Sequence, residues 1–333
     1  MNAPRLSPAR PPVYQPDRDI PAGSPRVSVV MPVYNGEQFI AESVRSVLAS
    51  ELADLELLVL DDGSTDRSVA VAREAAAGDA RLRIVSLPHG GVAAARNAGL
   101  REARAPLIAN LDADDVMLPQ RLTKQLAFLD AHPEYVAIGS RALVIDAHGI
   151  AKRVGVRLFT HEEIDRAHME GRGGAVWNPT MTFRKDVALR VGGYLDGLHT
   201  TGEDHDLWLR MAEVGRLANL PDVLVRYRIH GRNVSLSSAD RERRLAVTLE
   251  TLGRAFARRG ITDRTPAKIA APAAGLAERW RDAALLRFFS GERGRAMLLA
   301  LPACVLQPTS PATWAAARAI LREPKPRRSL VVQ

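Results

Sequence analysis

The stretch Asn110-Leu111-Asp112-Ala113-Asp114-Asp115 directly follows the apolar run Leu107-Ile108-Ala109. The run predicts a buried strand that delivers the three carboxylates at its C-terminal end. Carboxylates so close together repel one another, and they persist in water or around a cation. Hard cations such as Mg²⁺ and Mn²⁺ bind carboxylate oxygens and often leave positions for substrate phosphates. We therefore expect Asp112 and Asp114 to hold a divalent metal with a phosphorylated ligand. The alternative is an acidic turn into a helix near Pro119.

Upstream of this stretch, short apolar runs alternate with helical patterns. Strands are expected at 27–31, 55–60 and 82–85, with an amphipathic or alanine-rich helix after each. This alternation predicts an α/β fold built of βαβ units, with a mainly parallel, Rossmann-like sheet flanked by helices. Parallel strands bring their carboxyl ends to one edge, where open sheets bind ligands. The polar groups after three strands should therefore meet at one rim: Tyr34, Asn35, Asp61, Asp62, Asp112 and Asp114.

Composition divides the chain into three parts. Residues 1–25 hold seven prolines and predict a disordered leader, while 26–235 form the expected α/β domain. Residues 236–333 are rich in arginine and alanine and predict a basic helical region, with 18 Lys and Arg against 8 Asp and Glu. The preceding 235 residues hold 28 against 30, so the net charge of +8 is concentrated at the C-terminal end.

Several classes of protein are excluded. The single cysteine, Cys304, rules out an intrachain disulfide and a cysteine-based zinc site. The longest apolar run, Ala296–Leu306, contains Pro302 and falls well short of the ~18 residues of a spanning helix. No N-terminal segment has a signal-peptide core, so a cytoplasmic protein is expected. No nucleic-acid recognition motif accompanies the basic charge, so nucleic acid is not an expected partner.

Six blocks of sequence, in this order, resemble the inverting family 2 glycosyltransferases of the GT-A fold, of the bacterial type. They span about residues 27–235 and leave the basic C-terminal region outside the resemblance. The blocks are Met31-Pro32-Val33-Tyr34-Asn35, Asp61-Asp62-Gly63-Ser64-Thr65-Asp66, Ala95-Arg96-Asn97-Ala98-Gly99, Leu111-Asp112-Ala113-Asp114-Asp115, Glu203-Asp204-His205-Asp206-Leu207-Trp208 and Tyr227-Arg228-Ile229-His230.

The resemblance implies a pocket for a nucleoside-diphosphate sugar. Asp62 would accept a hydrogen bond from a uracil-type base, although it could instead form an Asx turn before Gly63. Arg96 would face the nucleotide or its diphosphate, although it could instead be a solvated arginine on a helix. The residues implied in this pocket are Pro32, Tyr34, Asn35, Asp62, Arg96, Asp112, Ala113 and Asp114.

The resemblance also implies a metal site and a catalytic pair. Asp114, Asp112 and His230 would contact Mg²⁺ or Mn²⁺, which would neutralise the departing diphosphate. Glu203 and Asp204 would form the acidic pair, with Asp204 as the general base that accepts the proton of an acceptor hydroxyl. Locally, the segment from Thr200 to Asp206 is equally typical of a capped helix start. Asp115 is expected as a supporting or helix-capping group, and Arg228 as a further diphosphate or metal contact.

The expected reaction is metal-dependent, inverting transfer of a sugar from a UDP or dTDP donor to a hydroxyl of a glycan or lipid-linked acceptor. The Gln-x-x-Arg-Trp element of processive members is missing, because Glu278-Arg279-Trp280 lacks the glutamine, so a single addition is expected. One alternative is a sugar nucleotidyltransferase, which would require a basic, Gly-rich loop at the position of Val33–Gln38. Another is a nucleotide-sugar-binding protein without catalysis.

The basic C-terminal region leaves two interpretations open. Its helices could lie on an anionic membrane surface beside a lipid-linked acceptor, which would make the protein peripheral at the inner face of the membrane. They could instead pack on the catalytic domain with their arginines in solvent.

Overall fold

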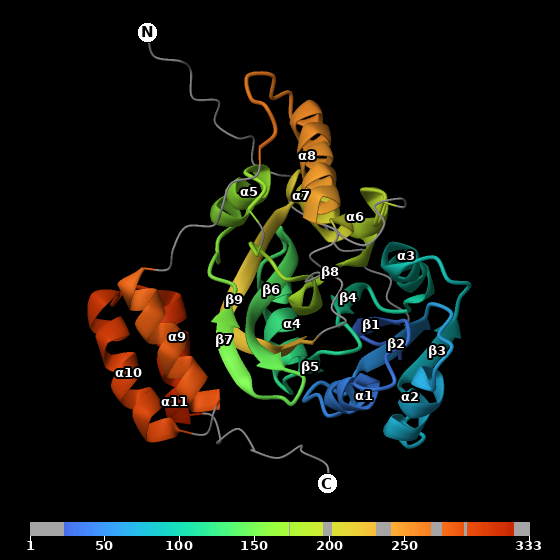
Figure 1. Ribbon diagram of the computed structural model, residues 1–333, viewed down its shortest axis with the longest axis horizontal. Coiled ribbons are helices and arrows are strands. Elements are labelled where there is room, and N and C mark those ends of the chain that lie inside the picture. The colour runs from blue at the N-terminus through green and yellow to red at the C-terminus, as the bar shows by residue number, and fades with distance from the viewer. Residues whose placement is uncertain are drawn as a thin grey trace.

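The computed structural model describes residues 23–172, 174–195, 202–230, 241–267, 275–289 and 292–322. Most of the predicted leader thus lies outside the described residues. Strands and helices alternate through the first part of the chain as predicted (Figure 1). These elements are β1 (Val27–Val33), α1 (Ile40–Leu48), β2 (Leu55–Asp61), α2 (Ser68–Ala76), β3 (Leu82–Ser86), α3 (Val92–Glu102), β4 (Leu107–Asn110), β5 (Val116–Met117) and α4 (Arg121–Ala131).

One half of the sheet is parallel, in the order β3-β2-β1-β4. Val30 of β1 lies opposite Leu58 of β2 on one side and Asn110 of β4 on the other. All seven residues of β2 are buried. A continuous apolar run is typical of a parallel strand that is covered on both faces. The predicted parallel arrangement is therefore correct for this half.

The other half of the sheet is mixed, so the expectation of a mainly parallel sheet needs correction. β8 is antiparallel to β4 and β6, whereas β6 and β9 are parallel. The stretch from Tyr135 to Asp146 is one continuous strand, whose register with β9 shifts around Arg141. The elements of this half are β6 (Tyr135–Asp146), β7 (Ala151–Gly155), α5 (His161–Met169), the 3-10 turn η1 (Asn178–Thr180), β8 (Thr182–Arg184), α6 (Lys185–Arg190), α7 (Glu203–Ala212) and β9 (Arg216–Ile229).

Helices cover both faces of the sheet. The apolar sides of α1, α2 and α4 share one core with the sheet, and those of α3, α5, α6 and α7 share the other. The α5 segment has a weak apolar pattern, yet it begins with a capping box in which Thr160 and Glu163 satisfy each other's backbone N–H groups. The core thus fixes the strand ends from both sides.

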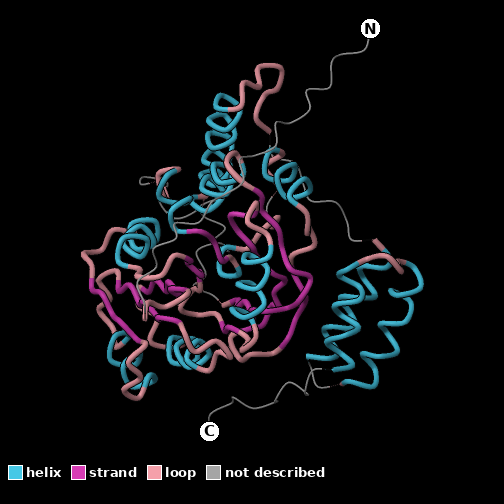
Figure 2. Tube along the Cα trace, turned by 180° about the vertical axis from the view of Figure 1, so that it is seen from behind, coloured by secondary structure: helices cyan, strands magenta, loops and turns pink. Residues whose placement is uncertain are grey.

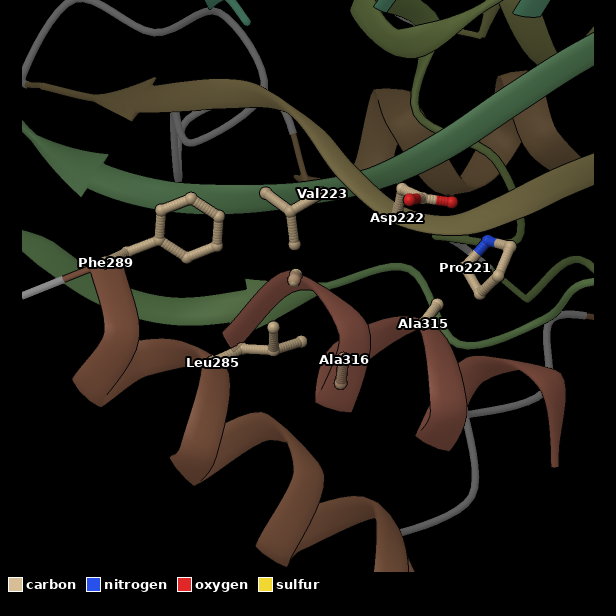
Figure 3. Close-up of a pocket in the computed structure, with 8 residues that line it drawn as sticks. Pro221, Asp222, Val223, Leu285, Phe289, Ala315 and Ala316 are labelled. Carbon is tan, nitrogen blue, oxygen red and sulfur yellow. The ribbon is translucent and has the colours of Figure 1, made fainter. Parts of the chain in front are cut away.

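The C-terminal helices do not form one unit. α8 (Arg241–Arg258) packs on α7, whereas α9 (Leu276–Phe289), α10 (Arg293–Leu306) and α11 (Pro311–Arg322) form a bundle beside β7 and β9 (Figure 2). Leu285 of α9 and Ala316 of α11 face Val223 of β9 across this junction (Figure 3). Within the described ranges, no helix combines the length and apolarity needed to cross a bilayer.

Candidate active site

Two rings stack at the end of β1 and define one end of the site. Tyr34, about half exposed at 51%, stacks on His89 with a centroid distance of 4.3 Å and an interplanar angle of 26°. Beneath them the buried Asp62 accepts hydrogen bonds from the backbone N–H groups of Gly90 and Gly91, at 2.8 and 2.9 Å. Asp62 therefore fixes the β3–α3 loop. His89 is not among the expected site residues, although its position in the loop after β3 was a signal that it lies at this edge of the sheet.

Asp62 uses its carboxylate for Gly90 and Gly91 rather than for the Asx turn considered for it, and its neighbour Asp61 bonds the turn instead. Asp61 accepts a hydrogen bond from the N–H of Ser64 at 3.0 Å. Pro32 is half-buried in β1, beside Leu60 of β2. The nucleotide contacts expected of Asp62 and Pro32 would be made at this end of the site.

Asn35 joins two loops of the rim. Its backbone has a positive φ of 52°, which asparagine tolerates better than most residues. The side-chain oxygen accepts a hydrogen bond from the N–H of Thr65 at 2.8 Å, and the Asn35 N–H donates to Ser64 Oγ at 3.0 Å. Asn35, which is expected in the nucleotide pocket, thus connects the β1–α1 loop to the β2–α2 loop.

Arg96 of α3 lies at the centre of the site, and the idea of a solvated arginine is wrong. The residue is 5% exposed. Its guanidinium donates from Nη1 to Glu203 Oε1 at 2.6 Å and from Nη2 to Asp112 Oδ1 at 2.9 Å. Burial lowers the pKa of Arg96, but Asp112 and Glu203 more than offset this and raise it above its usual value. One fixed cation therefore joins the end of β4 to the start of α7.

Three carboxyl groups crowd around this cation. Burial raises the pKa of Glu203 to about 7, with Asp204 adding to the rise and Arg96 opposing it. Burial also raises the pKa of Asp112, while Arg96 opposes that rise, and Asp204 repels Asp112 as well. Glu203 Oε2 is buried without a hydrogen-bond partner. Asp112, Glu203 and Asp204 are thus brought together around Arg96.

The expected catalytic pair, Glu203 and Asp204, opens α7. Gly202 caps the helix with a φ of 102°, and Glu203 is its first residue. Asp204 is half-buried and accepts a hydrogen bond from the N–H of His205 at 2.7 Å. A helix N-terminus stabilises negative charge on such side chains. The helix start and the acidic pair are therefore one feature, while Thr200 lies outside the described residues.

Asp114 and His230 lie in contact at the end of β9. His230 Nε2 is 2.9 Å from Asp114 Oδ2, and the imidazole packs on Phe39 with a centroid distance of 4.8 Å. The buried Arg228 donates from Nε to the backbone oxygen of Asp114 at 2.8 Å. It also donates to Glu42 Oε2 at 2.5 Å. Arg228, expected as a diphosphate or metal contact, thus fixes the loop that carries Asp112, Ala113 and Asp114.

Two further groups hold this loop from beneath. Asp115 is fully buried and accepts a hydrogen bond from the Arg228 N–H at 2.7 Å. Burial raises the pKa of Asp115 well above its usual range, with Asp114 adding to the rise. The hydroxyl of Ser43 of α1 lies 2.7 Å from the backbone oxygens of both Ala113 and Asp115, which share its single hydrogen. The supporting role expected for Asp115 fits this position, whereas sequence analysis missed Ser43.

A polar floor lies under Arg96. Asn110 donates a hydrogen bond to Tyr194 Oη at 2.7 Å, and its side-chain amide lies 2.9 Å from that of Asn178. Arg96 stands over the Tyr194 ring, 5.7 Å from its centroid. Asn97 exchanges two hydrogen bonds with the Tyr194 backbone. The asparagine of the Ala95-Arg96-Asn97 block thus orients the floor of the site.

Metal-binding capacity can be judged from the donor set. Asp112 and Asp114 are both partly exposed carboxylates, and His230 offers an imidazole nitrogen beside Asp114. Carboxylate oxygens are the donors that Mg²⁺ and Mn²⁺ prefer, and such ions are often held by one or two carboxylates plus substrate phosphates. Across the described ranges, no three His, Cys, Asp or Glu side chains are grouped as a metal site.

Comparison with known proteins gives a consistent result. Residues 28–188 match the model of glycosyl transferase family 2. The glycosyltransferase EpsE of Bacillus subtilis is 35% identical over 208 residues, which cover 61% of this chain and 73% of EpsE. The amylovoran biosynthesis glycosyltransferase AmsE of Erwinia amylovora is 31% identical over 205 residues, covering 60% of this chain and 75% of AmsE.

Solved structures resemble the fold. Residues 1–349 of S. aureus TarS, in complex with UDP-GlcNAc, superpose with a TM-score of 0.57 at 18% identity, covering 89% of this chain and 80% of that one. The mannosyltransferase PcManGT of Pyrobaculum calidifontis, in complex with GDP-Man and Mn²⁺, gives 0.50 at 20% identity, covering 93% and 90%. At these identities the likeness concerns the fold, which is GT-A as expected.

Proposed function

Because the chain belongs to the family 2 glycosyltransferases, we propose that it transfers one sugar from a nucleoside diphosphate to a hydroxyl of a glycan or lipid-linked acceptor, with inversion. The chain is a glycosyltransferase. The names of AmsE and of the O-antigen enzyme WbnJ support a role in making an envelope polysaccharide. The structures of TarS and PcManGT, with bound UDP-GlcNAc and GDP-Man, support a nucleotide-sugar donor. Of the possible bases, we propose UDP or dTDP.

One observation carries the proposal: Arg96 binds two carboxylates that arrive from distant parts of the chain. Asp112 follows β4 and Glu203 opens α7, yet both lie within 3 Å of the same guanidinium. Asp204 is near enough to act electrostatically on Arg96, Asp112 and Glu203. Such an acidic cluster, fixed by one buried cation at a sheet edge, is suited to binding and activating a polar substrate.

We propose that the donor lies along the rim from Tyr34 to Asp114. The Tyr34 and His89 rings offer an apolar face for the base, and Asp62 fixes the loop beside it. The diphosphate would then lie near Asp112 and Asp114, where Mg²⁺ or Mn²⁺ would be held by Asp114, Asp112 and His230. When bound, the cation would supply positive charge to the diphosphate oxygens.

The proposed chemistry assigns Asp204 as general base. The acceptor oxygen would attack the anomeric carbon on the face opposite the nucleoside diphosphate, whose bond to that carbon breaks. The proton of the acceptor hydroxyl would pass to the Asp204 carboxylate. Asp204 is half-buried in the first turn of α7, next to Glu203. The positive charge of Arg96 would offset the repulsion between the carboxylates of Glu203 and Asp112 and so hold both in place.

The test replaces Asp204 by asparagine, with Asp186→Asn in the first turn of α6 as the matched control. We expect Asp204→Asn to lower turnover about 10²- to 10⁴-fold, since a general base contributes this much. Turnover is followed as release of nucleoside diphosphate in the presence of a set of saccharide acceptors. Normal turnover in Asp204→Asn would remove the residue as the base.

Donor binding is measured separately on the same variants, and we expect it to be unchanged in Asp204→Asn. Nucleoside diphosphates are compared by thermal shift with and without Mn²⁺, because a ligand at hundredfold excess over Kd stabilises the fold by about 2.7 kcal/mol. The panel identifies the base and tests the metal together. Release of pyrophosphate from a nucleoside triphosphate would favour the nucleotidyltransferase alternative. Donor binding without any turnover of the unaltered protein would favour the inactive binding protein.

A further inference from the structure

The outer side of α10 exposes a stripe of large apolar residues. Leu298, Leu301 and Val305 are 70%, 62% and 78% exposed. Their spacing of three and four residues places them on one side of the helix. Met297 and Leu306 are also exposed beside them. We call these five residues the α10 face.

The opposite side of α10 is apolar as well. Ala296 and Ala303 are buried against the other helices of the bundle. A helix that is apolar on all sides is ordinarily buried or in contact with lipid, and soluble proteins rarely expose large apolar patches. α10 packs on α9 and α11, which separate it from β7 and β9 (Figure 1). The α10 face is therefore turned away from the sheet and needs another cover.

The two helices that carry and adjoin this face are basic overall. Residues 293–322 contain four arginines and no aspartate or glutamate, and Glu292 at the N-cap of α10 pairs with Arg295 at 2.7 Å. Arg295 and Arg318 are exposed on α10 and α11. Trp314 of α11 is 45% exposed, and its indole N–H donates to the Pro308 oxygen at 2.5 Å. An apolar stripe, exposed arginines and an exposed tryptophan form the combination by which helices bind the surface of an anionic bilayer.

We propose that the α10 face docks on the surface of an anionic membrane, with the helix lying in the plane of the headgroups. The apolar stripe would enter the boundary between headgroups and acyl chains, and the arginines would contact lipid phosphates. A second copy of the chain is a poorer cover, because a symmetric contact brings the same arginines face to face. The proposal does not depend on which donor or acceptor the site uses.

The experiment measures flotation of the 333-residue chain with phosphatidylcholine vesicles containing 30% phosphatidylglycerol. We expect binding that falls as salt is raised, and little binding to pure phosphatidylcholine. The double substitution Leu298→Glu and Leu301→Glu should reduce binding about tenfold or more, since it places charge on the inserting stripe. Arg295→Gln with Arg318→Gln should reduce it about fivefold for each charge removed.

The matched control is Leu189→Glu, another exposed leucine, on α6 at the far side of the molecule from α10. It should bind vesicles like the unaltered chain. All variants alter exposed side chains, so their thermal unfolding should be unchanged, and this is measured in parallel. Equal flotation of the α10-face variant and the control would overturn the proposal. The proposal would also be overturned if light scattering showed a dimer of the unaltered chain that the α10-face variant does not form, and if neither protein bound vesicles.

Discussion

At the scale of the residue, Arg96 explains how so many carboxylates share one site. Isolated, the carboxyl groups of Asp112, Glu203 and Asp204 would repel one another in a partly buried space. The guanidinium binds two of them and acts on the third. An arginine is suited to this position because it stays charged and has several donors in a rigid fork.

Glu203 gives a prediction about pH and stability. Burial raises its pKa to about 7 in the folded protein, so its contribution is fully present below the ordinary pKa near 4.5 and is lost as pH rises through 7. Glu203→Gln is neutral at every pH and should escape this loss. Relative to the unaltered protein, we expect the variant to gain free energy of unfolding between pH 5 and pH 8, on the order of 3 kcal/mol.

The measurement is urea unfolding of both proteins across that pH range. Glu102→Gln, an exposed glutamate in an ion pair with Arg83, is the control and should differ little from the unaltered protein at any pH. A constant difference between Glu203→Gln and the unaltered protein from pH 5 to pH 8 would contradict the prediction.

At the scale of the element, Gly99 sets how closely α3 approaches the sheet. A Cβ at this position would lie 2.6 Å from Val30 Cγ1 of β1. Alanine is the better helix former, yet here it should push α3 off the sheet. We expect Gly99→Ala to lower the free energy of unfolding by about 1–3 kcal/mol, the usual cost of overpacking.

Gly294 of α10 is the matched control for Gly99. Nothing lies within 4 Å of its added Cβ, so Gly294→Ala should stabilise the fold by up to about 1 kcal/mol. Both variants are compared by chemical denaturation, and transfer activity should fall only in Gly99→Ala, because α3 carries Arg96. A stabilising effect of Gly99→Ala would show that the helix can move without cost.

At the scale of the whole molecule, Asp282 fixes the C-terminal bundle to the sheet. It accepts hydrogen bonds from Arg141, which is completely buried in β6, and from Arg157 at 2.9 Å. Arg281 lies in the same cluster. Burial lowers the pKa of Arg141 to about 10, and Asp282 opposes this shift. A single carboxylate therefore compensates a buried arginine at the junction.

Replacing Asp282 by asparagine should leave Arg141 uncompensated. Breaking a buried pair in this way costs about 3–5 kcal/mol, so we expect the bundle to unfold at lower urea concentration than the catalytic domain. Tryptophan fluorescence can follow this, since Trp280 and Trp314 belong to the bundle. Glu250→Gln, which alters an exposed ion pair on α8, should behave as the unaltered protein does. A single unchanged transition in Asp282→Asn would contradict this account.

Much of the molecule follows from local pattern. Alternating apolar runs predicted β1, β2, β3 and β4, the helices between them and the parallel half of the sheet, because periodicity and turn residues act over short stretches. The antiparallel direction of β8 was not predicted, since strand direction depends on distant partners. α5 was missed because its signal lies in the Thr160 and Glu163 cap rather than in apolar spacing.

The sequence alone determined the family blocks, the acidic residues and the basic character of the C-terminal end, because each is a property of neighbouring residues. Only the tertiary structure decided that Arg96 is buried between Asp112 and Glu203, the latter 107 positions away. It also decided that one side of α10 has no cover among the described residues. Burial and charge pairing depend on which segments meet in space, and no stretch of chain contains that information by itself.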